Sequence, residues 1–401
     1  MSGNIFNVTS PVYMDESIKN YSYRPIYSYY NTQYNVNDLV TFTINQKEVL
    51  TLPHRSQLLI EVKIKRPAKV KPEDATLAVK FSPMSVLHLF SKISYSINGQ
   101  VIDEVNNPGI TTAMKSALSL NMDAATVFKR LVDGFSTTED HVSFCIPLSL
   151  VLGFFEDYQK VVFNSQQELS LIRAQTNFNA IESKTGVDLN IINMIWQIPF
   201  VEPNETTKLA MYKIINSNST INMVFRNWSL YTHPSLPSVK KLTWPIRTVT
   251  SMERPRFIIV GFQTDKNNNI TANAGKFDHA KIKNVSVQLG TERYPYLPFN
   301  VDFDKNLIEQ LYLEAARFRG KYYGVHEFNS KLDEINFALN SSLWVIDTQH
   351  QPEVASSSNM DIKLEIESEN DFPEKTECHC LILSDRVVEY SPLSGIVKHL
   401  V

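Results

Sequence analysis

The order of β-rich segments in the first half of this 401-residue chain is repeated in its second half. The first half contains, in order, Leu39–Asn45, Arg55–Ile64, Lys92–Glu104, a helical stretch, Gln167–Arg173 and Asn190–Pro203. The second half contains Lys241–Thr250, Arg254–Phe262, Lys283–Arg293, a helical stretch, Met360–Ile366 and Cys378–Pro392. Few residues are identical between the halves, so the repeat is one of element order. Two similar β-domains favour a protein that works through its surfaces over one with a single catalytic cleft.

Alternation of apolar and polar residues predicts that these segments are half-buried strands. Val40, Phe42 and Ile44 alternate with polar residues, and the run from Leu58 to Ile64 repeats the pattern. Asn98-Gly99 lies between two alternating runs, and both residue types tolerate positive φ, so we predict a hairpin there. The corresponding turn of the second half is Leu289-Gly290-Thr291.

The helical stretches fall at equivalent places in the two halves, at Met114–Leu131 and Asp304–Phe318. The apolar face of the second stretch consists of Leu307, Leu311, Ala315 and Phe318. Asp304 is the expected N-cap of this helix, because an aspartate side chain can accept hydrogen bonds from the first turn. A shorter helical piece is predicted at Pro83–Phe90, before the hairpin.

These patterns together predict an all-β fold with inserted helices. We expect a double jelly roll, that is, two tandem eight-stranded antiparallel β-sandwiches, each made of two four-stranded sheets packed face to face. The predicted limits are a Tyr-rich N-terminal arm at 1–35, jelly roll 1 at 36–203 and jelly roll 2 at 204–401. Residues 204–233 are interpreted as a linking segment, with Asn216–Ser219 as a turn between two further strands.

The N-terminal segment differs from the rest of the chain in its tyrosines. It contains Tyr21, Tyr23, Tyr27, Tyr29, Tyr30 and Tyr34. These residues lie among Ser, Asn, Pro and Gln without a helical or strand period, so the segment cannot bury a core of its own. Tyrosine offers a large rigid contact area with a polar tip, and we therefore predict an ordered arm that docks on a neighbouring surface. The alternative is a floppy terminus.

Composition excludes several classes of protein. The formal net charge is −3, with charged residues at 20%, which argues against electrostatic coating of nucleic acid because that requires a basic surplus. Three cysteines cannot form a disulfide framework, and the N-terminus lacks the pattern of a secretory signal. The longest apolar run, Val142–Phe155, contains a proline and two serines and is too short to span a bilayer. We expect folding in the cytoplasm or nucleus.

Cys378-His379-Cys380 is the motif that most resembles a metal site. On a strand, however, the two cysteines point to one face and the histidine to the other, so the three cannot hold one ion together. Glu365, Glu367 and Glu369 recur at a period of two, as paired carboxylates could, but their alternation with Leu364 and Ile366 predicts the solvent face of a strand.

No nucleophile motif is present, and only 12 glycines in 401 residues argue against phosphate-binding loops. The four tryptophans lie in or beside predicted strands, which favours core packing over a sugar-binding platform; they are Trp196, Trp228, Trp244 and Trp344. His88, between two leucines, is interpreted as a packed or surface histidine. The sequence therefore predicts no catalytic, cofactor-binding or metal-binding residue, and no enzymatic activity.

Four segments resemble the double jelly-roll major capsid proteins of the Polinton/Maverick and adintovirus-like family. They are Tyr30–Tyr34 (YNTQY), Thr51–Ile64 (TLPHRSQLLIEVKI), Ser94–Val105 (SYSINGQVIDEV) and Leu381–Gly395 (LILSDRVVEYSPLSG). The likeness extends over most of the chain and consists of segment order and style. The loops are shorter than in that family, and no clear amphipathic helix precedes the first strand. The resemblance therefore does not decide whether the protein contacts an internal membrane.

The resemblance implies a structural capsid protein that self-assembles. Three chains would form a trimer of near-hexagonal outline, and neighbouring trimers would form the icosahedral shell of a DNA virus or virus-like element. It also implies a single jelly-roll penton protein as a partner, no sequence-specific binding of nucleic acid, and a location in the virion capsid after assembly in the host nucleus or cytoplasm. The alternatives are a lectin-like or adhesin β-sandwich and, less favoured, a β-sandwich hydrolase.

Overall fold

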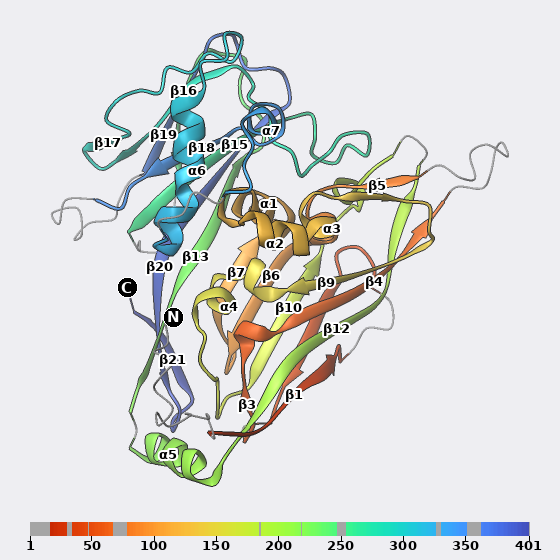
Figure 1. Cartoon of the computed structure of the whole chain (residues 1–401), viewed down its shortest axis with the longest axis vertical. Helices are drawn as coiled ribbons and strands as arrows, with labels where there is room; N and C mark the ends of the chain where they lie inside the picture. Colours follow the sequence, from red (N-terminus) through yellow and green to blue (C-terminus); the bar gives the residue numbers. More distant parts are fainter. Residues whose placement is uncertain are drawn as a thin grey trace, which may run out of the picture.

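The structure of the protein is a computed structural model of the full chain (Figure 1). The structure describes residues 17–29, 34–46, 48–66, 78–183, 186–217, 219–246, 254–325, 330–350 and 362–400. The ends of two predicted strands, Lys241–Thr250 and Met360–Ile366, lie outside these ranges. Most of the predicted N-terminal arm lies outside them as well.

Among the described residues, each half of the chain contributes eight strands to a β-sandwich. In the first half they are β1 (Ile18–Tyr27), β2 (Leu39–Ile44), β4 (Gln57–Lys65), β6 (Phe90–Ile97), β7 (Gln100–Asn106), β9 (His141–Pro147), β10 (Gln167–Arg173) and β12 (Asp188–Pro203). In the second half they are β13 (Ile221–His233), β14 (Lys241–Ile246), β15 (Pro255–Thr264), β16 (Ile282–Leu289), β17 (Glu292–Tyr294), β18 (Leu343–Asp347), β19 (Ile362–Ser368) and β20 (Thr376–Ser391).

The two sandwiches have the same strand order. The sheets of the first are β1-β12-β4-β9 and β2-β10-β6-β7, and those of the second are β13-β20-β15-β18 and β14-β19-β16-β17. If these eight strands are counted from one in each half, both sandwiches follow the orders 1-8-3-6 and 2-7-4-5. All of these pairings are antiparallel. The predicted double jelly roll is confirmed.

Short additional strands enlarge the sheets beyond the four strands expected for each. β3 (Leu50–Thr51) pairs with β12, and β21 (Ile396–Leu400) pairs with β20. A separate small sheet in the first half consists of β5 (Val79–Phe81), β8 (Phe135–Thr137) and β11 (Ile181–Glu182).

Helices fill the connections between strands. They are α1 (Pro108–Ser119), α2 (Met122–Val127), α3 (Lys129–Val132), α4 (Gly153–Asp157), α5 (Glu205–Asn216), α6 (Glu309–Tyr323) and α7 (Glu334–Asn340). Short 3₁₀ helices are η1 (Pro53–Arg55), η3 (Ser85–Leu89), η4 (Leu148–Leu150) and η5 (Phe178–Ala180). Figure 1 shows α1–α3 and α6–α7 in the region where the sandwiches meet. Among the helices of the described residues, none has both the length and the apolarity needed to cross a membrane.

Two helix predictions differ from the structure in their limits. The stretch Met114–Leu131 contains parts of three helices. The backbone is extended at Leu120 and Asn121, which separates α1 from α2, and it leaves the helical conformation again at Phe128, between α2 and α3. The predicted helix at Asp304–Phe318 begins at Glu309, so Asp304 is not its N-cap and pairs instead with Lys281. Leu307 lies before the helix and is exposed, whereas the rest of the predicted apolar face is buried.

The N-terminal arm and the linking segment also differ from their predictions. Residues 18–27, placed in an arm outside the first sandwich, form the edge strand β1, which pairs with β12 over its whole length. In the linking segment, a helix (α5, Glu205–Asn216) stands where a strand was expected before the turn at Asn216–Ser219. β1 escaped detection because none of its residues is fully buried, so the segment shows no clear alternation of apolar and polar residues. α5 escaped because none of its residues is buried.

The strands obey the predicted alternation, and the core lies between the sheets. Val40, Phe42 and Ile44 of β2 are buried, whereas Leu39 is exposed at the strand end. The predicted hairpin at Asn98-Gly99 joins β6 to β7, with φ of +50° and +79° at the two residues. Such angles suit asparagine and glycine, which is why this short signal identified the turn correctly.

A charge at Val388 is expected to prevent folding. Val388 is fully buried on β20, between β13 and β21, and burial of an unpaired carboxylate costs several kcal/mol. We expect Val388→Asp to abolish soluble, folded protein in expression and circular dichroism assays. Val224→Asp places the same change at a 54% exposed position of the adjacent strand β13 and should yield folded protein. Equal soluble yields from the two variants would contradict the assignment of β20 to the core.

Candidate functional site at the junction of the two sandwiches

The two sandwiches are joined by the packing of α4 from the first against β13 from the second. Gly153 allows this approach, because a Cβ atom there would lie 1.7 Å from the carbonyl oxygen of Arg226. Phe154 packs edge-to-face on Phe225, with ring centroids 5.3 Å apart. The buried Asp103 accepts a hydrogen bond from the Phe154 amide (2.9 Å) and so fixes the start of α4.

Next to this contact, six residues form a polar network that we call the junction cluster. The first sandwich supplies Lys115, Glu156 and Asp157, and the second supplies Arg226, Tyr322 and Tyr323. Lys115 pairs with Glu156 at 2.6 Å, and both side chains are largely buried. Both tyrosine hydroxyls donate to Glu156, at 2.8 and 2.7 Å. The two cations match the two carboxylates, so the cluster is neutral.

Arg226 makes most of the contacts within the cluster. Its backbone amide and its Nε both donate to Asp157 Oδ2 at 2.8 Å, and a guanidinium nitrogen also pairs with Asp157 Oδ1. Its Nη1 donates to the carbonyl of Tyr322 (2.6 Å), and its guanidinium lies 3.6 Å from the centre of the Tyr322 ring. A guanidinium with a fixed fork of donors suits this site better than a lysine would.

The electrostatics keep the cluster ionised. Burial alone would raise the pKa of Glu156, but the charge and hydrogen bond of Lys115, with the hydrogen bond from Tyr323, outweigh it and lower this pKa. Burial would lower the pKa of Arg226, but the hydrogen bonds and charge of Asp157 raise it instead. Each charged group of the network is paired with an opposite charge inside it, so the network fixes the orientation of the two sandwiches.

A loop of the second sandwich reaches over to the first at another point. This loop, residues 265–278, is called the strap. The Asn268 amide donates to Asn179 Oδ1 (2.7 Å), and the Ser183 amide donates to the carbonyl of Ile270 (2.8 Å). Gly275 lies against Pro83, where a Cβ atom would come within 2.7 Å of the proline ring.

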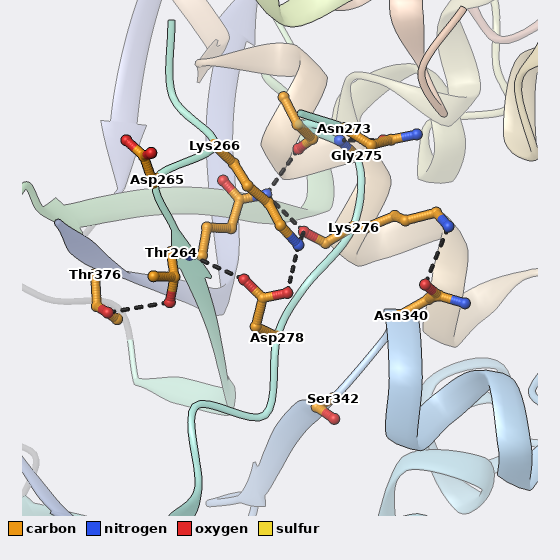
Figure 2. Close-up of polar contacts among 12 residues, drawn as sticks. Thr264, Asp265, Lys266, Asn273, Gly275, Lys276, Asp278, Asn340, Ser342 and Thr376 are labelled. Atoms are coloured by element: carbon orange, nitrogen blue, oxygen red, sulfur yellow. Dashed lines mark hydrogen bonds and ion pairs between the residues drawn. The ribbon is translucent and has the colours of Figure 1, made fainter. Parts of the chain in front are cut away.

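Polar contacts inside the second sandwich hold the strap in shape, as Figure 2 shows. Lys266 Nζ contacts Asp278 Oδ1 (2.5 Å) and the carbonyl of Lys276 (3.0 Å), while the Thr264 amide donates to Asp278 Oδ2. Lys276 Nζ donates to Asn340 Oδ1 (3.0 Å) at the end of α7. The conformation of the strap is therefore fixed by hydrogen bonds and an ion pair.

Between the strap and the helices lies a cavity of about 580 Å³, bordered by α1–α3 on one side and α7 on the other. Its described lining contains no histidine or cysteine, and its charged groups include the ion pair of Lys331 with Asp133 across the junction. Its other charged lining residues are Lys129, Lys276 and Asp333.

The structure separates the residues of the Cys378-His379-Cys380 motif as strand geometry predicts. Both cysteines are buried, and burial raises the pKa of each thiol. His379 lies on the other face, where Nε2 donates to Gln263 Oε1 (3.1 Å) and Nδ1 accepts from Thr232 Oγ1 (3.2 Å). Among the described residues, no group of three or more His, Cys, Asp or Glu could hold a metal ion.

The other residues considered from sequence also lie apart from the junction cluster, with one exception. Glu365 and Glu367 lie on the solvent-facing side of β19, where Glu365 pairs with Arg293.

Trp196, Trp228 and Trp344 are core residues, and Trp244 is half-buried on β14. Trp228 is the exception, because its ring lies 5.3 Å from Lys115 Nζ. His88 is buried against Gly109, and Cys145 is exposed on β9.

Acid is expected to destabilise the fold through two buried histidines. Burial lowers the pKa of His88 to about 4, and burial together with the charge of His88 lowers that of His379 to about 4. In the unfolded chain both imidazoles take up a proton near pH 6.5, whereas in the folded protein they do so only near pH 4. The stability that the neutral histidines contribute is therefore fully present above pH 6.5 and is lost as the pH falls toward 4. The loss amounts to about 3 kcal/mol for each histidine.

Urea unfolding at several pH values between 4 and 7 would measure this loss. His379→Gln preserves one hydrogen-bonding side chain without a titrating ring and should reduce the pH slope, while His350→Gln is the exposed control. An unchanged slope in His379→Gln would contradict the prediction.

Sequence reasoning identified none of the six residues of the junction cluster. Glu156 and Asp157 follow an apolar run that was considered only for membrane insertion, and Arg226 lies in the segment interpreted as a linker. Two adjacent carboxylates at the end of an apolar run were the one available signal, since such residues are rarely buried without partners.

The chain is similar to known proteins of one fold. The family described as double jelly roll-like domain matches residues 79–388. No curated protein is similar to the chain in sequence.

Solved structures resemble it over nearly its whole length. The PBCV-1 virus capsid has 12% identity and a TM-score of 0.64, with 98% of this chain and 99% of that chain covered. The Faustovirus major capsid protein has 9% identity and a TM-score of 0.62, with coverage of 96% and 92%. The mavirus major capsid protein has 9% identity and a TM-score of 0.54, with coverage of 100% and 93%. At these identities the likeness shows the fold.

Proposed function

Because the chain belongs to the double jelly roll-like family, we propose that it is a structural major capsid protein. Three copies would assemble as a pseudo-hexagonal trimer, and trimers would tile the icosahedral shell of a DNA virus or virus-like element. Within that family we propose the Polinton/Maverick, adintovirus-like group. We propose no enzymatic role.

The observation that carries this proposal is the identical strand order of the two sandwiches within one chain. Two equivalent bodies per chain turn threefold symmetry into six similar lateral edges, which lets one kind of chain pave a flat surface. The buried junction cluster supports the same conclusion, because a tile must hold its two halves at a constant angle. We propose to draw the domain limits by topology, with jelly roll 1 from β1 to β12 and jelly roll 2 from β13 onward.

The partners follow from this role. We propose that neighbouring trimers contact one another through exposed lateral surfaces, that a single jelly-roll penton protein closes the vertices, and that nucleic acid is enclosed without sequence-specific contacts. Assembly would occur in the host nucleus or cytoplasm, and the mature location would be the virion capsid.

Purified protein provides the test. Light scattering coupled to gel filtration should give three times the 45.9 kDa chain mass, and negative-stain images should show particles of hexagonal outline, alone or in shells. A monomer at all concentrations that binds glycans on an array would overturn the capsid role in favour of the lectin-like alternative.

A further inference from the structure

Two buried histidines, one from each sandwich, lie on either side of the contact between the strap and the first sandwich. His88 belongs to η3 of the first sandwich, and His379 belongs to β20 of the second. They are 6% and 1% exposed. A positive charge on His88 acts on His379, so the two rings are near enough across the junction to interact electrostatically.

His88 supports the first-sandwich side of this contact. Its ring is hydrogen-bonded to the backbone of Pro83 and packs on Gly109, where a Cβ atom would lie 2.4 Å from the ring. Pro83 in turn contacts Gly275 of the strap, as described above. The Nε2 atom of His88 has no hydrogen-bond partner among the described residues. The ring therefore lies directly behind the residue that the strap contacts, in a site that suits only its neutral form.

His379 supports the strap side of the contact through Gln263. The side-chain nitrogen of Gln263 donates to the carbonyls of Ala274 (2.7 Å) and Lys276 (3.0 Å), the residues on either side of Gly275. The side-chain oxygen of Gln263 accepts from His379 Nε2. A displacement of His379 is therefore transmitted to the part of the strap that contacts the first sandwich.

A protonated His88 has no counter-charge among the described residues. The elements that pack against η3 are α1, η5 and β6. η5 has no ionisable side chain, and those of the other two elements have partners of their own: Lys115 with Glu156, Lys92 with Glu104, and Tyr95 with Gln167. No described carboxylate lies within ion-pair distance of the His88 ring.

His379 has one carboxylate nearby. Glu377 Oε2 lies 3.7 Å from His379 Nε2, and the other carboxylate oxygen of Glu377 accepts from Asn267 of the strap. The remaining charged residues of the strap, β13 and β15 have other partners: Asp265 with Lys375, Lys266 with Asp278, Lys276 with Asn340, Arg226 with Asp157, His233 with Trp244, and Arg256 with Asp385. Glu377 therefore offsets part of the cost of a charge on His379 and leaves His88 uncompensated.

We propose that His88 and His379 form an acid-sensitive latch, whose protonation releases the strap from the first sandwich while both sandwiches stay folded. Two imidazolium ions in this buried site repel each other, and their hydration requires the strap to move away. Other contacts of the strap with the first sandwich are hydrogen bonds of exposed or half-buried residues such as Asn268, where water can replace them. The ion pairs of the junction cluster still join the two sandwiches.

The direction of the pH effect follows from burial. Burial lowers the pKa of His88 to about 4, and burial with the charge of His88 lowers the pKa of His379 to about 4. An imidazole in water titrates near pH 6.5, so the closed strap is fully stable above that pH and loses stability as the pH falls toward 4. Pro83, Gly275 and Lys276 border the cavity of about 580 Å³, so release opens this cavity to solvent. The latch belongs to a single chain and does not depend on the proposed assembly.

Thiol labelling tests the latch. Ala274, which is 1% exposed, is changed to cysteine in a Cys145→Ser background, which removes the one exposed native cysteine among the described residues. The probe is 4,4′-dithiodipyridine, and each rate is divided by that of the urea-unfolded chain at the same pH. The relative rate at position 274 should rise by about a hundredfold between pH 7 and pH 4.5, with about tenfold or more from each histidine. The Cys145→Ser parent, whose two remaining cysteines are buried in the second sandwich, should stay unreactive.

Histidine variants assign the effect to the latch. His88→Gln and His379→Gln, each in the Ala274→Cys background, should reduce the rise to about tenfold, because one titrating ring remains. His350→Gln changes an exposed histidine and should leave the full rise.

Three results would overturn the latch. The first is a labelling rate at position 274 that does not change with pH. The second is equal acid-induced reaction of the buried cysteines in the parent chain, which means that the whole fold opens. The third is a full rise in both histidine variants. If these variants fold poorly, the comparison of Ala274→Cys with its parent still decides, and either result leaves the capsid proposal standing.

Discussion

Arg226→Met is expected to destabilise the protein by about 3–5 kcal/mol, because it leaves Asp157 as a largely buried carboxylate without its cation. The methionine fills much of the arginine volume, so the loss reports the charge and not a cavity. It also removes the hydrogen bond to the Tyr322 carbonyl, which ties α6 to β13. Urea unfolding followed by circular dichroism and by tryptophan fluorescence would measure the effect.

Two controls define its origin. Arg256→Met removes a similar pair, with Asp385, that is exposed on both sides, and it should cost less than about 1 kcal/mol. Adding Asp157→Leu to Arg226→Met should restore part of the stability, because a buried ion pair can be replaced by apolar groups at little cost. If Arg226→Met and Arg256→Met behave alike, the junction cluster does not hold the sandwiches together.

Gly153→Ala is expected to destabilise the protein by about 3 kcal/mol or more, although alanine is the better helix former. Helix propensity alone would predict a gain of about 1 kcal/mol at a helical glycine. The new Cβ would lie 1.7 Å from the carbonyl oxygen of Arg226, and a backbone atom cannot turn away as a flexible side chain can. Relief of the clash therefore requires α4 and β13 to separate.

Calorimetry would detect that separation. We expect the variant to lose cooperativity between the sandwiches, so that a single transition of the wild type becomes two. Gly99→Ala is the matched control, since it has no neighbour within 4 Å and costs only the strain of its positive φ, about 1 kcal/mol. A Gly153→Ala variant as stable as the wild type would contradict the tight approach of α4 to β13.

Local patterns predicted the individual elements well where one face was buried. The strands around Val40 and Leu58 alternate at a period of two, and the turn at Asn98-Gly99 requires residues that accept positive φ. The predictions were wrong where a segment lacked a buried face. β1 has no fully buried residue and so shows no clear alternation, and α5 buries no residue. Asp304 was chosen as a cap by residue type alone, and the helix begins five residues later.

The sequence by itself determined that this chain is two β-sandwiches of the same element order, because alternation, turns and helix periodicity are local properties that each segment expresses before it meets the others. Only the tertiary structure decided how the sandwiches are joined. Lys115, Glu156 and Arg226 come from distant segments, and their partnership depends on α4 reaching β13 through the space left by Gly153. The energy of an ion pair depends on the distance between the charges and on their burial, and neither quantity can be predicted from the spacing of residues along the sequence.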